Sequence, residues 1–161
     1  MSEQSFTTTI TVDRAPEEVF DAINDVRGWW SQEVEGSTDR VGEVFRYRGH
    51  DEADTVEHLA TIRVEELVPG RRVVWRVLDN SMSFIADQSE WRDTVIRFDI
   101  AATDAGTTVR FTHEGLVPSY ECFDVCHDAW TLYVTDSLPR LITTGRGVPI
   151  TPSASPLPSG R

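Results

Sequence analysis

One stretch of this sequence repeats apolar residues at the spacing of an α-helix. If Trp130 marks the centre of a face, the helical step places on the same face Phe123, Cys126, Val134, Ser137 and Leu141. This pattern predicts an amphipathic helix over residues 119–144, ended by Gly145. Pro139 lies inside the pattern and removes a backbone donor, so we expect a kink or a break between Thr135 and Pro139.

Before this helix, apolar and polar residues alternate in short runs, as they do in half-buried strands. The runs cover residues 6–12, 42–48, 58–67, 71–78, 94–101 and 107–114. Two short helices are expected after the first run, one opened by Pro16 and one around Trp29 and Trp30. Residues 79–93 have no clear period and are expected to form a long loop.

The order of these elements predicts the fold class. The apolar face of the sheet must be covered, and only the C-terminal helix is long enough to cover it. We therefore predict an α+β fold in which a curved antiparallel sheet of about six strands wraps around the long C-terminal helix. A length of 161 residues, of which 39% are apolar, predicts a single domain over 1–148. The Pro- and Ser-rich segment 149–161 is expected to be disordered.

Composition and charge exclude several classes of function. The net charge of -12 argues against binding to nucleic acid or to an anionic membrane surface. No apolar run approaches the roughly 20 residues that cross a bilayer, and a signal-peptide pattern is lacking, so we expect a cytoplasmic protein without membrane insertion. All 15 basic residues are Arg, which excludes Schiff-base chemistry on lysine. Gly-rich phosphate loops are lacking too, and we expect no cofactor.

Several segments resemble a known family. They read RAPEEVFDAI, GWW, PGRRVVWRV, SEWRDTVIRFDI, TTVRFTHEGLVPSYECFDVC and AWTLYVTDSLPRLITTGRGVP, and they span about residues 6–150. The sequence resembles the START-like (SRPBCC) superfamily, in the branch named for the activator of heat-shock-protein ATPase, homologue-like. This resemblance implies a helix-grip fold with a deep apolar cavity between sheet and helix. Relatives bind lipids, sterols or polyketides there, and some catalyse cyclisation or dehydration.

His113 is the sharpest candidate for chemistry. Strand alternation sends it inward with Phe111, close to the start of the helix. An imidazole at that position could act as an acid or base on a bound carbonyl group. The alternative is a buried histidine whose nitrogens bond to neighbouring groups.

The two cysteines suggest three other roles. Cys122, Cys126 and His127, together with His113, could form a tetrahedral zinc site, but CxxxCH on one helix is not an established spacing for such a site. The resemblance implies a metal-free protein, so we predict no metal. An oxidant-sensing thiol pair is a further alternative, and packing in the core is the simplest one. A GxSxG nucleophile motif is absent from the sequence.

Aromatic and polar residues on the inward positions could line a pocket for a flat ligand. We predict that the ligand-binding residues are Trp75, Phe98, Phe111, His113, Tyr120, Phe123, Cys126, Trp130 and Tyr133. Trp29, Trp30 and Trp91 are expected at the mouth of this pocket. The opposite face of the sheet is expected to be a solvated face on which four arginines pair with Asp99 and Glu114: Arg72, Arg76, Arg97 and Arg110.

The leading functional prediction is binding of a small apolar or aromatic ligand, such as a lipid or a polyketide-like metabolite, in a cavity between sheet and helix. The first alternative is a cavity enzyme of the cyclase or dehydratase type that uses His113 as acid or base. The second is a co-chaperone-like interaction protein. The sequence leaves a homodimer open.

Overall fold

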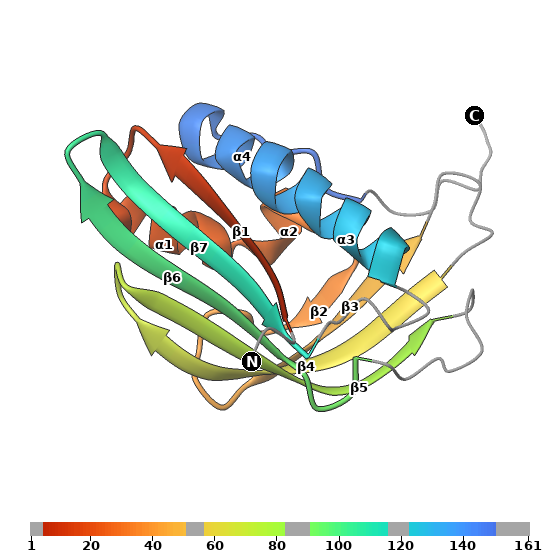
Figure 1. Ribbon diagram of the computed structural model, residues 1–161. Coiled ribbons are helices and arrows are strands. Elements are labelled where there is room, and N and C mark those ends of the chain that lie inside the picture. The colour runs from red at the N-terminus through yellow and green to blue at the C-terminus, as the bar shows by residue number, and fades with distance from the viewer. Residues whose placement is uncertain (1–4, 51–56, 83–90, 116–122, 151–161) are drawn as a thin grey trace, which may run out of the picture.

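Seven antiparallel strands form one curved sheet within the residues that the structure, a computed structural model, describes: 5–50, 57–82, 91–115 and 123–150 (Figure 1). The strands are β1 (Ser5–Val12), β2 (Val34–Gly36), β3 (Val44–His50), β4 (Glu57–Val68), β5 (Arg72–Met82), β6 (Val95–Thr103) and β7 (Gly106–Glu114). Their order across the sheet is β1-β7-β6-β5-β4-β3-β2, so the first strand pairs with the last. The predicted α+β class and the curved antiparallel sheet are confirmed.

The helices fall where the sequence placed them. Two short helices, α1 (Pro16–Asn24) and α2 (Val26–Trp29), follow β1, and the first opens with Pro16 and two glutamates in its first turn. The C-terminal helical run consists of α3 (Phe123–Leu132), η1 (Tyr133–Ser137) and α4 (Leu138–Thr144). Figure 1 shows this run lying over the concave side of the sheet. No helix in the described ranges is long and apolar enough to cross a membrane.

Of the kink or break expected between Thr135 and Pro139, the break does not occur. Helical structure continues from α3 through α4, and the intervening segment η1 is a π-helix in which the N–H of Leu138 donates to the carbonyl of Tyr133, five residues earlier. Pro139 is then the second residue of α4. The N–H groups in the first turn of an α-helix have no acceptor within that helix, so a proline is tolerated there. The wider π turn therefore accommodates the proline without ending the helix. The helix closes at Gly145, whose φ of 84° gives the left-handed cap expected there.

Three features of the secondary structure differ from the prediction. Residues 79–82, expected at the start of a loop over 79–93, belong to β5, which continues to Met82. β2 has only three residues, too few for an alternating pattern to reveal it. Ile150, expected within the disordered segment 149–161, is hydrogen-bonded to the rest of the fold: its N–H donates to the carbonyl of Trp30 at 2.9 Å, and the N–H of Gln32 donates to its carbonyl at 2.8 Å. Residues 151–161 lie outside the described ranges.

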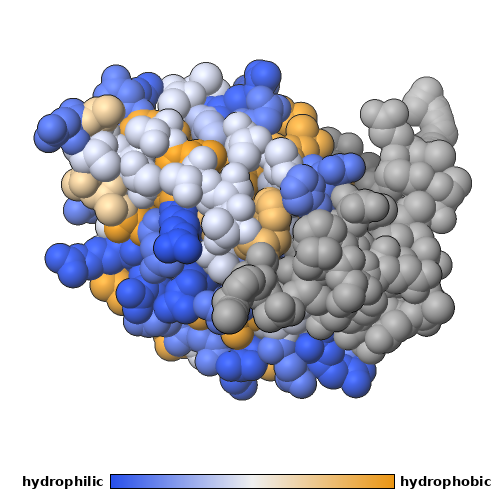
Figure 2. Space-filling model, in the orientation of Figure 1, coloured by the Kyte–Doolittle hydropathy of each residue, from blue (hydrophilic) through white to orange (hydrophobic). Residues whose placement is uncertain are grey.

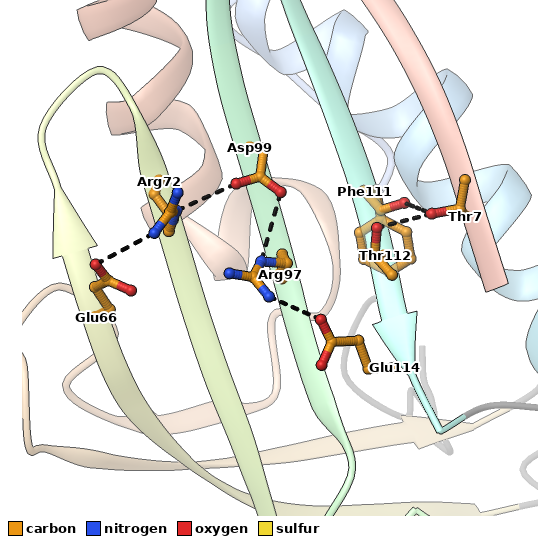
Figure 3. Close-up of polar contacts among 8 residues, drawn as sticks. All are labelled: Thr7, Glu66, Arg72, Arg97, Asp99, Phe111, Thr112 and Glu114. Carbon is orange, nitrogen blue, oxygen red and sulfur yellow. Dashed lines mark hydrogen bonds and ion pairs between the residues drawn. The ribbon is translucent and has the colours of Figure 1, made fainter. Parts of the chain in front are cut away.

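The two faces of the sheet separate apolar from charged side chains. Along β6 and β7 the inward residues are buried, as alternation predicted: Ile96, Phe98, Ile100, Val109, Phe111 and His113. On the outer face, Arg97 lies 2.8 Å from Glu114, and Arg72 lies 3.2 Å from Asp99 and 3.6 Å from Glu66 (Figure 3). These pairs are partly exposed, so each adds little stability, but together they keep this face hydrated.

Candidate ligand site

A cluster of buried aromatic rings occupies the space between the sheet and the C-terminal helix. Trp30 lies at its centre, with ring centroids 3.9 Å from Tyr47, 4.7 Å from Trp130, 6.0 Å from Trp75 and 6.4 Å from Trp91. Trp30 itself is only 2% exposed. The two tryptophans of the GWW motif therefore belong to the interior, and Trp91 also lies inside rather than at an exposed mouth.

The structure brings together most of the predicted ligand-binding residues that it describes. Phe111 contacts Phe98 at 5.2 Å and Trp130 at 4.7 Å, and Trp75 contacts Phe98 at 5.1 Å. These four side chains are essentially unexposed, so at mid-sheet the rings pack against one another as a core. Cys126 is buried beside them and Tyr133 is partly buried. Tyr120 lies outside the described residues, as does the side chain of Phe123.

His113 has a partner for each of its ring nitrogens. The indole N–H of Trp130 donates to Nδ1 at 3.0 Å, and Nε2 lies 2.8 Å from the hydroxyl of Thr94. That hydroxyl donates its own proton to the carbonyl of Trp91 at 2.6 Å, so it accepts from Nε2–H. The bonds define a neutral imidazole with its proton on Nε2. Burial, with a smaller contribution from nearby His58, lowers the pKa of His113 to about 3.

His58 is a second buried histidine in the same cluster, and the sequence reasoning missed it. Its ring makes edge contacts with Trp91 at 4.2 Å and with Tyr47 at 5.4 Å. Burial lowers its pKa to about 3. Its Nε2 is buried and has no hydrogen-bond partner in the described part of the chain. A signal was present in the sequence, since His58 shares the phase of Ala60, Ile62 and Val64 on β4.

Trp91 lies between the two histidines and is held by its backbone. Its N–H donates to the side-chain oxygen of Asn80 at 3.1 Å, and its carbonyl accepts from Thr94. The ring contacts His113 at 4.7 Å and stacks with Trp130 at 5.6 Å. Its indole N–H is buried and lacks an acceptor among the described residues. Because Trp91 stands in a turn, no strand or helix period could have placed it.

Tyr47 forms the wall beside His58. Its ring packs along β3 over Gly49, where a Cβ would collide with the Tyr47 hydroxyl. Burial raises the pKa of Tyr47 well above its ordinary value, and proximity to Tyr133 and Cys126 adds to this shift. Burial also raises the pKa of Tyr133. The two tyrosines therefore stay neutral at physiological pH and present hydroxyl groups rather than charges.

The suggested zinc site receives no support from the geometry. Cys122 lies outside the described residues, Cys126 is buried, and His127 is partly exposed with its ring 4.9 Å from Phe6. Within the ranges that the structure covers, no three His, Cys, Asp or Glu side chains are grouped as metal ligands.

A curved antiparallel sheet closed by a C-terminal helix, with an aromatic interior between them, defines this molecule as a START-like helix-grip protein. More narrowly, the chain belongs to the family described as activator of Hsp90 ATPase homolog 1-like protein, whose family model matches residues 13–143. Both parts of the predicted resemblance are confirmed.

Solved structures share this fold at low identity. The solution structure of the Aha1 dimer from Colwellia psychrerythraea is similar with a TM-score of 0.69 and 21% identity, covering 89% of this chain and 98% of that one. A protein from Chromobacterium violaceum gives 0.66 and 20%, covering 87% and 98%. DynU16, from the dynemicin biosynthetic locus, gives 0.64 and 17%, covering 91% of this chain and 49% of its own. No curated protein matches the chain.

Proposed function

We propose that this protein binds a small, neutral, flat apolar or aromatic molecule between the sheet and α3. The observation that carries this proposal is the chemistry of the interior. Among the described residues, those that are buried include no Asp, Glu or Arg, and the buried polar groups are neutral. A charged ligand would lose its hydration there without gaining an opposite charge, whereas a flat neutral ring would gain stacking surfaces.

The ligand belongs at the end of the sheet where β3 ends and β4 begins. The middle of the concave face is filled by tryptophan and phenylalanine rings. Toward His50 and Glu57, the inward side chains become mixed, with Tyr47 and His58 beside Trp91. Aromatic walls that carry a few polar atoms are typical of small-molecule sites.

Binding is better supported than proton-transfer catalysis. A general acid or base works best when its pKa lies near the operating pH, and the pKa values of His58 and His113 are lowered to about 3. His113 would also have to break its bond to Trp130 or Thr94 before it could reach a substrate. These two features count against the cyclase or dehydratase alternative.

A protein-interaction role has weaker support. Among the described residues, the large apolar side chains that are exposed come from separate elements and loops: Val41, Val44, Leu59, Leu132 and Val148. In Figure 2 the described part of the visible surface is mostly hydrophilic or intermediate, with apolar residues scattered over it. Co-chaperone contacts usually need a continuous apolar patch. The dimeric relative from C. psychrerythraea makes a homodimer of this chain a reasonable extension, which light scattering would measure.

Two measurements test the proposal. Native mass spectrometry and organic extraction of the purified protein should find a retained neutral compound. Titration with the neutral fluorophore N-phenyl-1-naphthylamine should quench tryptophan emission, and Tyr133→Ala should weaken this binding because Tyr133 lies on the helix side of the cluster. Leu132→Ala is the matched control, since Leu132 precedes Tyr133 in the C-terminal helical run and its side chain is exposed. A wild-type protein without retained compound and without fluorophore binding would overturn the proposal.

A further inference from the structure

The two buried histidines of the aromatic cluster differ in one decisive respect. His113 has both nitrogens engaged, by Trp130 and by Thr94. Nε2 of His58 has no protein partner within the described ranges, although the whole side chain is buried. Buried polar atoms are nearly always hydrogen-bonded, so an unpaired imidazole nitrogen calls for an explanation.

A second unpaired atom belongs to the ring that packs against His58. The rings of His58 and Trp91 meet edge to face at 4.2 Å, and the indole N–H of Trp91 also has no acceptor among the residues described. Asn80 and Thr94 fix the backbone of Trp91, and packing against Trp130 and His113 holds its ring, so the indole N–H is not free to turn toward another acceptor. Two rings in contact at the start of β4 therefore carry, among the residues described, an unpaired donor and an unpaired imidazole nitrogen.

We propose that Nε2 of His58 and the indole N–H of Trp91 together bind the hydroxyl group of a neutral aromatic ligand, such as a phenol or naphthol. This inference rests on the proposed ligand-binding function and specifies its ligand class. The ligand oxygen accepts from Trp91. The ligand O–H donates to His58 when that nitrogen is unprotonated.

A hydroxyl fits this pair better than other oxygen groups. If the proton of His58 lies on Nδ1, the ligand hydroxyl donates to Nε2, and if it lies on Nε2, the hydroxyl oxygen accepts from it. A carbonyl oxygen satisfies only the second arrangement. A carboxylate would need a cation, and the rings in contact with the pair carry no charge at neutral pH: Trp30, Tyr47, His113 and Trp130.

The experiment compares matched naphthalenes by tryptophan quenching or calorimetry at pH 7. The wild type should bind 2-naphthol about tenfold more tightly than naphthalene, the factor expected for roughly one net hydrogen bond. It should bind the anion 2-naphthoate more weakly than either. His58→Phe and Trp91→Phe should each bring 2-naphthol to within about twofold of naphthalene while naphthalene still binds, because the apolar walls remain. Circular dichroism shows whether each variant is folded. If one variant does not fold, the other alone is sufficient to test the inference.

His127→Gln is the control, since this histidine lies on the partly exposed side of α3 and should keep the tenfold preference. The inference fails if naphthalene and 2-naphthol bind equally to the wild type, or if both phenylalanine variants keep the preference for 2-naphthol. In either case the two polar groups are hydrogen-bonded to water, and the proposed ligand binding still stands. If no naphthalene binds at all, both the inference and the proposed function fail. Tighter binding of 2-naphthoate would overturn the neutral ligand class.

Discussion

Acidification is expected to destabilise this protein through its two buried histidines. Burial lowers the pKa of His58 and of His113 from 6.5 to about 3. Between these values the unfolded chain binds more protons than the folded chain. Stability is therefore fully present above about pH 6.5 and is lost as the pH falls toward about 3.

The size of this loss follows from proton linkage. At pH 5 the unfolded imidazoles are almost fully protonated and the folded ones almost fully neutral. Relative to pH 7, this difference costs about 2 kcal/mol for each histidine. His58 and His113 together would remove about 4 kcal/mol, a large share of the roughly 5–15 kcal/mol that stabilises a typical domain.

Urea denaturation at pH 7 and at pH 5, followed by tryptophan fluorescence, measures the loss. His58→Phe removes one of the two imidazoles and should reduce the loss to about 2 kcal/mol. His127→Gln is the control and should keep the full loss, because 44% of that side chain is exposed and water reaches it in the folded state. If His58→Phe loses as much stability on acidification as the wild type, His58 is not held neutral by the fold, and the reasoning is refuted.

Three further substitutions test the packing around the site by urea denaturation at pH 7. Trp130→Phe removes the donor to Nδ1 of His113 and should cost about 1–3 kcal/mol, the penalty for an unpaired buried acceptor. Gly49→Ala places a Cβ against the Tyr47 hydroxyl and should cost about 1–3 kcal/mol by overpacking. Gly145→Ala places a residue with a Cβ at a backbone φ of 84°. The space around that Cβ is open, so the expected loss of stability is about 1 kcal/mol from backbone strain alone.

Each of these substitutions has a contradicting result. An unchanged stability in Trp130→Phe would mean that Nδ1 of His113 finds another donor. For Gly49→Ala, the double variant with Tyr47→Phe should recover part of the loss, because the colliding hydroxyl is gone. No recovery would place the collision elsewhere. A loss well above about 2 kcal/mol in Gly145→Ala would require a steric contact in addition to backbone strain.

Much of the fold was predictable because its signals are local. Alternation in β6 and β7 identified the inward residues, since a sheet with one hydrated face imposes a period of two. Helical spacing around Trp130 identified the buried face of the C-terminal run, where Val134 and Ser137 are buried as expected. Pro139 predicted a kink or a break, and the break did not occur, because a proline signals only a missing donor. Whether a π turn or a break accommodates it depends on packing against the rest of the molecule.

The site was harder to predict because its properties depend on which side chains are hydrogen-bonded to each other, and not only on which positions of a strand face inward. His113 and His58 both face inward by alternation, and sequence cannot show that Trp130 and Thr94 occupy one imidazole and leave a nitrogen of the other free. Trp91 lies outside any periodic element. Its place between the two histidines is fixed by its backbone bonds to Asn80 and Thr94, which depend on tertiary structure.

The distribution of unpaired buried atoms is the strongest reason to place function in the aromatic cluster. In the part of the chain that the structure describes there are four such side-chain atoms, and three belong to this cluster: Nε2 of His58, Nε1 of Trp75 and Nε1 of Trp91. Each costs about 1–3 kcal/mol compared with a fully bonded group. Phenylalanine at these positions would avoid that cost and keep most of the apolar contact. Polar nitrogens that serve stability would be paired, as those of His113 are, so the two left unpaired on the contacting rings of His58 and Trp91 are better explained by a ligand that bonds to them.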